Sequence, residues 1–106
     1  MKRYLLAPEA QKDLREIRRY LLKEAGLSVS RHVLRKINQS LRFLAATPGA
    51  GHVRQDLTDE PVKFWPVFSY MIVSDPVSRP IGIVRVLHGK RDIAAILAQG
   101  EDRPPP

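Results

Sequence analysis

The stretch IGIVRVLHGKRDIAAIL, residues 81–97, joins a strand pattern to a helix pattern through a cluster of ionisable groups. Its first part, IGIVRVL at 81–87, is a nearly continuous apolar run, which is typical of a central strand with neighbours on both sides. After HGKRD, the segment DIAAILA at 92–98 has the pattern of a short helix that Asp92 can cap. We therefore expect several ionisable side chains at the point where a central strand ends.

Two longer amphipathic segments precede this strand. After a short strand candidate at residues 2–6, Pro8 marks a helix start, and apolar residues at helical spacing follow as far as Gly26. A second helix begins shortly after and ends before TPGAG at 47–51. The two helices should form an antiparallel hairpin whose apolar stripes face a common sheet. These stripes are Ala10, Leu14, Ile17 and Leu21 in the first helix and Val29, Val33, Ile37, Leu41 and Leu44 in the second.

Two strand candidates lie between the helices and the central strand. They are VKFWPVF at 62–68 and SYMIVS at 69–74, with little turn between them. Because Pro66 has no N–H to donate, it marks an edge, a bulge or a break in its strand. The segment DPVSRP at 75–80 reads as the turn that leads into the strand at 81–87.

The element order predicts the fold class. A strand, two helices, three strands and a short helix make an α+β domain, in which the helical hairpin packs on a small, mostly antiparallel sheet. The 106 residues, 43% hydrophobic and 27% charged, suit one compact core. We expect the single domain to cover residues 1–98 and the tail at 99–106 to be disordered.

The composition excludes several kinds of site. The chain has no cysteine, so it has no disulfide, no thiolate zinc site and no cysteine nucleophile. Its three histidines lack metal-ligand spacing, and no metal or cofactor is expected. No apolar run approaches the roughly 20 residues that span a bilayer, and no signal peptide is visible, so we expect a cytoplasmic protein without a membrane partner.

The positive charge is unevenly distributed. Residues 1–47 hold 11 Lys and Arg against 4 acids, whereas residues 48–106 hold 7 of each, so the net charge of +7 lies in the first half. Such a basic half can attract nucleic acid or an acidic protein by long-range steering. It can equally be a solvated helical face.

The cluster after the central strand has two interpretations. Histidine is the side chain that most readily gains and loses a proton near neutral pH, so His88 can serve as a general acid or base. Lys90 and Arg91 would then hold a phosphate and stabilise developing charge. The alternative is a histidine that hydrogen-bonds its own turn.

Arg85 interrupts the apolar strand, and a charge in such a place is seldom buried without a partner. The sequence favours a structural ion pair with an acid such as Asp56 or Asp92, with a phosphate or partner contact as the alternative. Arg54 follows two glycines in a loop that lacks the pattern of a phosphate-binding loop. For Trp65, we favour the role of a core or interface anchor over that of a platform on which a nucleic-acid base stacks.

Four segments in order resemble the ParE/RelE superfamily of bacterial type II toxins, from about Tyr4 to Leu97. They are YLLAPEAQKDLREIRRYL, PGAGHVRQDL, FWPVFSYMIV and IGIVRVLHGKRDIAAIL. The ParE-like positions are Leu6, Pro8, Ala10, Asp13, Leu14, Ile17, Tyr20, Pro48, Gly51, Arg54, Asp56, Leu57, Val67, Tyr70, Arg85, Val86, Leu87, His88, Arg91 and Asp92.

The resemblance implies a fold and a partner. It implies a helical hairpin on an antiparallel sheet, and a small ParD-like antitoxin that wraps the toxin with an amphipathic segment. ParE-like members are associated with inhibition of DNA gyrase without an enzymatic site, whereas RelE-like members cleave messenger RNA in the ribosome. Both branches share the fold, so the residues of the site must distinguish them.

The residues favour the ParE-like branch. No tyrosine follows Tyr70, and the last helix carries no catalytic side chain, which leaves His88 as the only proton-transfer candidate. Ser74 and Asp75 depart from the aromatic and basic residues that are common in ParE-like chains. If the protein were a nuclease, its catalytic residues would be His88, Arg85 and Arg91. The expected contacts to the target or antitoxin are Arg54, Arg85, His88, Lys90, Arg91 and Trp65.

Overall fold

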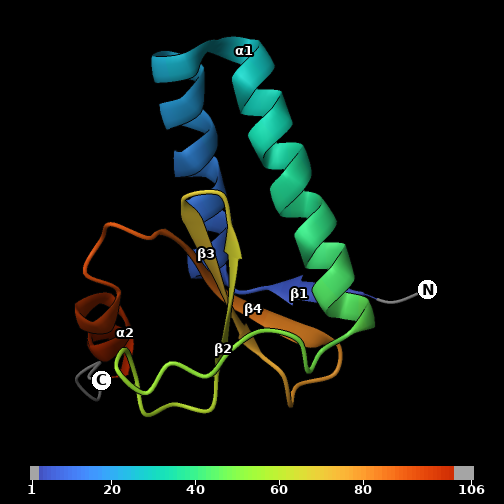
Figure 1. Ribbon diagram of the computed structural model, residues 1–106, viewed down its shortest axis with the longest axis vertical. Helices are drawn as coiled ribbons and strands as arrows, with labels where there is room; N and C mark the ends of the chain where they lie inside the picture. The colour runs from blue at the N-terminus through green and yellow to red at the C-terminus, as the bar shows by residue number, and fades with distance from the viewer. Residues whose placement is uncertain (1–2, 102–106) are drawn as a thin grey trace.

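The computed structural model describes residues 3–101 and contains a helical hairpin standing on a small sheet (Figure 1). The sequence-predicted order of elements is confirmed. The chain forms β1 (Tyr4–Leu6), α1 (Pro8–Ala46), β2 (Lys63–Val67), β3 (Tyr70–Asp75), β4 (Ile81–His88) and α2 (Ile93–Glu101).

The end of the chain differs from the prediction. Helix α2 continues to Glu101, so residues 99–101 are helical rather than part of a disordered tail. The rest of the expected tail, 102–106, and the start of the first expected strand, 1–2, lie outside the described residues. In the part of the chain that is described, neither helix combines the length and apolar character that crossing a membrane requires.

The sheet is four-stranded and mixed, in the order β1-β4-β3-β2. Strand β4 pairs with β1 in parallel and with β3 in antiparallel orientation, so the apolar run at 81–87 is central as predicted. Strand β2 contains Pro66 and lies at an edge of the sheet, as the proline indicated. An edge strand has a neighbour on one side only, so the missing N–H of the proline does not interrupt a central ladder.

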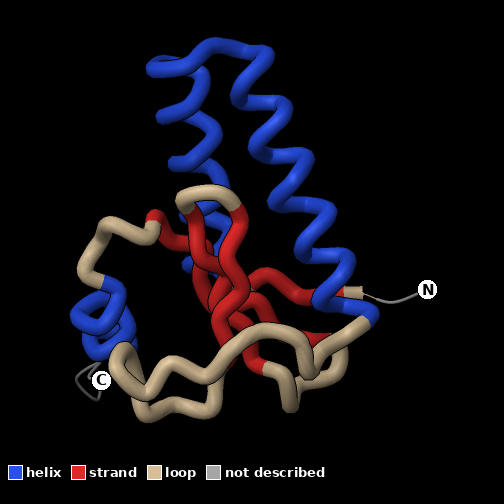
Figure 2. The backbone as a smooth tube through the Cα atoms, viewed as in Figure 1, coloured by secondary structure: helices blue, strands red, loops and turns tan. Residues whose placement is uncertain are grey.

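The two arms of α1 are joined by a bend at Gly26. This residue has φ 87° and ψ 174°, a conformation that is essentially restricted to glycine. The arms then run back side by side above the sheet (Figures 1 and 2). The hairpin is as predicted, but it turns within one glycine instead of a longer loop.

Both faces of the sheet are covered. On the α1 side, Ile72 and Ile83 are fully buried among residues that include Ile37 and Leu44 of the second arm. On the other side, the fully buried Phe64, Val73 and Leu87 pack with Ile93 of α2. Burying each large apolar side chain contributes about 1.5–3 kcal/mol.

One position of the predicted apolar stripe is wrong. Val29 is 45% exposed, whereas the neighbouring Ser30 is 2% exposed. Ser30 lies seven positions before the buried Ile37 and therefore shares its face of the helix, whereas Val29, eight positions before Ile37, points about 80° away from that face. A run of steps of four residues drifts around the helix, so the apolar stripe predicted from Val29 leaves the buried face at its first position.

A β-bulge in β4 reassigns its faces. The pairing with β3 skips Val84, so the alternation of side chains changes there. As a result Ile83 and Val86 both belong to the core on the α1 side, and Leu87 belongs to the core on the α2 side. His88 therefore follows Val86 to the α1 side, where the groove described next lies.

Candidate functional site: a groove between the helical hairpin and the sheet

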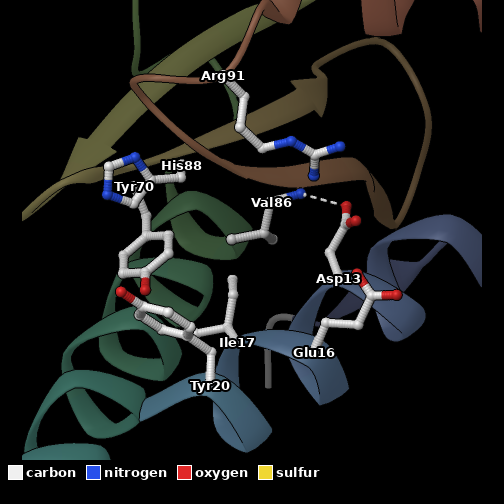
Figure 3. A pocket seen from close by; sticks show the side chains of 8 residues that line it. All are labelled: Asp13, Glu16, Ile17, Tyr20, Tyr70, Val86, His88 and Arg91. Carbon is white, nitrogen blue, oxygen red and sulfur yellow. Dashed lines mark hydrogen bonds between the residues drawn. The ribbon is translucent and has the colours of Figure 1, made fainter. Parts of the chain in front are cut away.

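An open groove of about 370 Å³ lies between the first arm of α1 and the adjoining ends of β3 and β4 (Figure 3). The helical wall comes from residues spaced i, i+3, i+4 and i+7, which share one face of a helix. The opposite wall comes from both strands and from the turn after β4. The lining residues are Asp13, Glu16, Ile17, Tyr20, Tyr70, Val86, His88 and Arg91.

The groove is anchored at one end by an ion pair between helix and sheet. The Asp13 carboxylate is 4% exposed and accepts hydrogen bonds from Nε and Nη2 of Arg85, each at 2.8 Å. Asp13 Oδ2 also accepts the backbone N–H of Val86 at 3.0 Å. The hydrogen bond to Asp13 raises the pKa of the Arg85 guanidinium, while burial acts in the opposite direction.

The predicted ion pair of Arg85 is present, but its partner is Asp13 and not Asp56 or Asp92. Asp92 instead accepts the N–H of Ala95 at 3.1 Å, which confirms its predicted role as the helix cap. Asp56 accepts two hydrogen bonds from Arg54, at 2.9 and 2.7 Å. Arg85 pairs with a residue 72 positions away because α1 crosses over β4, a contact that sequence spacing does not reveal.

Tyrosine and histidine rings form the other end of the groove. Tyr70 and His88 are cross-strand partners, with ring centroids 5.3 Å apart and ring planes at 80°. Burial, and secondarily the nearby Tyr20, raise the pKa of the Tyr70 hydroxyl. His88 Nδ1 accepts the backbone N–H of Lys90 at 3.1 Å, so this histidine does hydrogen-bond its own turn.

The structure separates the six predicted contact residues. His88 and Arg91 line the groove, and Arg85 lies beside it through Asp13. Lys90 is exposed on the turn. The other two residues lie elsewhere: Arg54 is paired with Asp56 in the loop before β2, and Trp65 lies against Phe43 of the second arm, with the two ring planes tilted by 38°.

Most of the groove was missed at the level of function. Asp13, Ile17, Tyr20 and Tyr70 carry part of the resemblance to ParE toxins, but the sequence predicted no binding role for them, and it did not single out Glu16. A signal was present, because Asp13 occupies the apolar stripe between Ala10 and Ile17. A carboxylate in such a stripe requires a buried partner. Within residues 3–101, no three His, Asp or Glu side chains are arranged to hold a metal ion.

The hairpin on a four-stranded mixed sheet defines a small α+β domain whose fold is also seen in a solved structure of a toxin–antitoxin system. One similar solved structure is described as the chromosomal ParDE TA system from P. aeruginosa. The match has a TM-score of 0.70 and 17% sequence identity, and it covers 83% of this chain and 96% of that chain. At this identity, the similarity establishes the fold.

Residues 4–93 match the family described as the ParE toxin of type II toxin-antitoxin system, parDE. The chain therefore belongs to the ParE toxin family, as the resemblance of its sequence indicated. No match was found among curated proteins.

Proposed function

We propose that this ParE toxin acts by binding and inhibiting DNA gyrase, without a catalytic step of its own, and that a cognate antitoxin neutralises it. The observation that carries the proposal is the family match, which spans residues 4–93 and so includes both walls of the groove.

The chemistry of the groove supports binding over RNA cleavage. A nuclease site needs cationic groups that are free to hold a phosphate and stabilise its charge. Here Nε and Nη2 of Arg85 already donate hydrogen bonds to the Asp13 carboxylate, so this side of the guanidinium is not available to a phosphate. Asp13 and Arg85 neutralise each other, and the exposed carboxylate of Glu16 lines the same groove and would repel a phosphate. Arg91 is then the one cation among the lining residues.

The same groove suits an amphipathic segment of an antitoxin. Ile17, Tyr20, Tyr70 and Val86 provide an apolar floor, and Tyr20 is 59% exposed in the free chain. An amphipathic helix can place its apolar side chains on such a floor. We expect the isolated toxin to be less soluble than the complex, which light scattering with and without the antitoxin can measure.

A supercoiling assay tests the target. Purified toxin is titrated into gyrase with relaxed plasmid, and inhibition should disappear when the antitoxin is added first. Normal supercoiling at a large excess of folded toxin would remove gyrase as the target. A heat-denatured sample of the same toxin is the control for non-specific effects.

A ribosome-dependent nuclease remains the second candidate because His88 and Arg91 line one groove. It predicts cleavage of translated messages after induction, and His88→Ala or Arg91→Ala should abolish that cleavage. Under our proposal, message profiles stay unchanged after induction of the wild-type toxin.

A further inference from the structure

A shallow cleft lies between the two arms of α1, on the face of the hairpin next to β1. Its volume is about 250 Å³, and its floor is apolar, with Leu14 from the first arm and Leu34 and Ile37 from the second. Arg15 and Arg18 of the first arm also line the cleft, and both are exposed. None of these residues lines the groove described above, so the cleft belongs to a different surface.

The second arm adds a row of arginines to this surface. Asn38 lines the cleft, and Arg31, Arg35 and Arg42 lie seven positions before it, three before it and four after it. Residues at these spacings share one side of a helix, so the three arginines flank the cleft. All three are exposed, and none forms an ion pair with another residue among 3–101. We call the whole surface the arginine face; it consists of Arg15, Arg18, Arg31, Arg35 and Arg42.

The acidic residues of the first arm lie on its other side. Asp13 and Glu16 line the first groove. Besides the hydrogen bond to Asp13, the negative charges of Glu9 and Glu16 raise the pKa of Arg85, so Glu9 also lies near that groove. Around the helix axis, Glu9 and Glu16 are about 160–180° from Arg18. Helical spacing therefore separates the two signs of charge onto opposite sides of the arm.

The rest of the hairpin is equally one-sided. Glu24 lies seven positions after Ile17, so it shares the side of the first groove. From residue 25 to residue 55 the sequence contains no Asp or Glu, so the second arm has no acid. Within α1, the arginine face thus gathers positive charge without a negative group among it. Such segregation produces a strong local positive potential, which the net charge alone does not require.

The lysines of the hairpin lie off the arginine face. Lys36 lines a second groove, which faces the β2–β3 hairpin and also contains Trp65. Lys12 and Lys23 are about 120–140° from Arg18 around the first arm. A guanidinium presents a planar fork of donors that matches a phosphate, whereas a lysine acts as a point charge. The use of arginine alone on this face favours phosphate groups over a general attraction to negative surfaces.

The arginine face has no exposed ring on which an unpaired base could stack. Tyr4 lines the cleft, but it is half-buried and its hydroxyl donates a hydrogen bond to Asn38 Oδ1 at 3.1 Å. The exposed aromatic side chains of the described chain line the first or the second groove; they are Tyr20, Phe43 and Phe68. Single-stranded nucleic acids are held largely by stacking on aromatic rings. Arginines without such rings suit a duplex, whose phosphates face outward and whose bases are hidden.

We propose that the arginine face binds the phosphate backbone of double-stranded DNA, without reading its sequence. The arginines of the two arms would contact phosphates on either side of the cleft. The Asn38 amide, whose oxygen is engaged by Tyr4, keeps N–H groups that can donate to the same backbone. Duplex RNA carries similar phosphates, and the choice of DNA rests on the proposed function, because gyrase acts on duplex DNA.

Fluorescence anisotropy tests the proposal on the full chain in the absence of gyrase. The probe is a labelled DNA duplex of about 20 base pairs, roughly two turns, and the salt concentration is raised from about 50 to 200 mM. Each arginine that neutralises a phosphate contributes about 0.9 to the slope of log affinity against log salt. The arginine face should therefore give a slope that approaches about −4.5 when all of its members contact phosphate.

Paired substitutions separate the site from net charge. Arg35→Gln with Arg42→Gln should reduce the slope by about 1.8 and the affinity at low salt by about tenfold. Lys36→Gln with Lys90→Gln removes the same charge from exposed positions off the face, and it should leave the slope unchanged. Arg35→Lys with Arg42→Lys should keep the slope but lower the affinity, because the fork of donors is lost. All these positions are exposed, so the melting temperatures should stay the same.

Several results would overturn the proposal. One is the absence of duplex binding by folded toxin at low salt. Another is an equal change of slope in the paired arginine and paired lysine variants to glutamine, which would leave net charge as the only cause. Tighter binding of single-stranded DNA or duplex RNA of the same length would assign the face to that ligand. Phosphatidylglycerol vesicles that displace the DNA, and that bind the arginine-to-lysine variant as well as the wild type, would assign it to a membrane surface.

The proposed function and this proposal fail in different experiments. The anisotropy measurement contains no gyrase, so its failure leaves gyrase inhibition in place. Normal supercoiling in the presence of toxin would remove gyrase as the target, whereas the binding of DNA to the arginine face would still be measured directly.

Discussion

The ion pair between Asp13 and Arg85 should dominate the stability of the contact between the hairpin and the sheet. Removing one partner of a buried, hydrogen-bonded ion pair costs about 3–5 kcal/mol. The Arg85 side chain is 18% exposed and can regain some hydration, and an asparagine at position 13 keeps one acceptor. We therefore expect Asp13→Asn to lower the free energy of unfolding by about 2–3 kcal/mol.

For a domain of this size, that change corresponds to a melting temperature lower by about 10–15 °C. Differential scanning calorimetry and urea unfolding of the two proteins at pH 7 would measure it. Asp56→Asn is the matched control, because Asp56 also accepts two hydrogen bonds from one arginine but is exposed. That variant should have the same melting temperature as the wild type, since exposed ion pairs contribute little to the free energy of unfolding.

A double mutant tests the cause of the loss. In Asp13→Asn combined with Arg85→Leu, the asparagine can still accept the Val86 N–H and no buried charge is left unpaired. This double mutant should regain at least about 1 kcal/mol relative to Asp13→Asn alone. If Asp13→Asn and Asp56→Asn shift the melting temperature equally, or if the second substitution adds further loss, the ion pair does not anchor the hairpin.

Three further predictions concern the backbone, the core and pH. Gly26→Ala should cost about 1–3 kcal/mol, because nothing obstructs a Cβ there and only the positive φ resists it, whereas Gly49→Ala should leave the denaturation midpoint unchanged. Ile72→Ala, at a fully buried position, should cost about 2–5 kcal/mol in urea unfolding, against little change for the 59% exposed Leu5→Ala. Burial raises the pKa of the Tyr70 hydroxyl above its ordinary 10.0. The stability that this hydroxyl contributes is therefore complete below pH 10.0 and falls as the pH rises toward the pKa of the folded state. Above pH 10.0, Tyr70→Phe should lose less stability than the wild type, because phenylalanine has no proton to release.

The local patterns of the sequence were sufficient for the architecture. Apolar periodicity is a property of neighbouring residues, so it identified the two helical arms and the central strand at 81–87, and Gly26 marked the end of the first arm. The order of these patterns also carried the resemblance to ParE toxins, which the match of residues 4–93 confirms. Pro66 indicated an edge strand for a reason that is equally local, the missing N–H.

The candidate site depended on contacts that no local pattern encodes. Arg85 was recognised as needing a counter-ion, but the choice of Asp13 over Asp56 or Asp92 depends on where α1 crosses β4. The bulge at Val84 also changes the alternation of side chains along β4, so that His88 faces the hairpin. This change of face does not follow from a strict two-residue alternation along the sequence.

By itself, the sequence determined which segments form helices and strands, which strand is central and which family the chain belongs to. Only the tertiary structure decided that Asp13 holds Arg85, that Tyr20, Tyr70 and His88 share a groove, and that Trp65 belongs to a different one. The reason is physical. Hydrophobic burial acts on the average character of a segment, whereas an ion pair or a groove depends on the position of individual atoms brought together from distant parts of the chain.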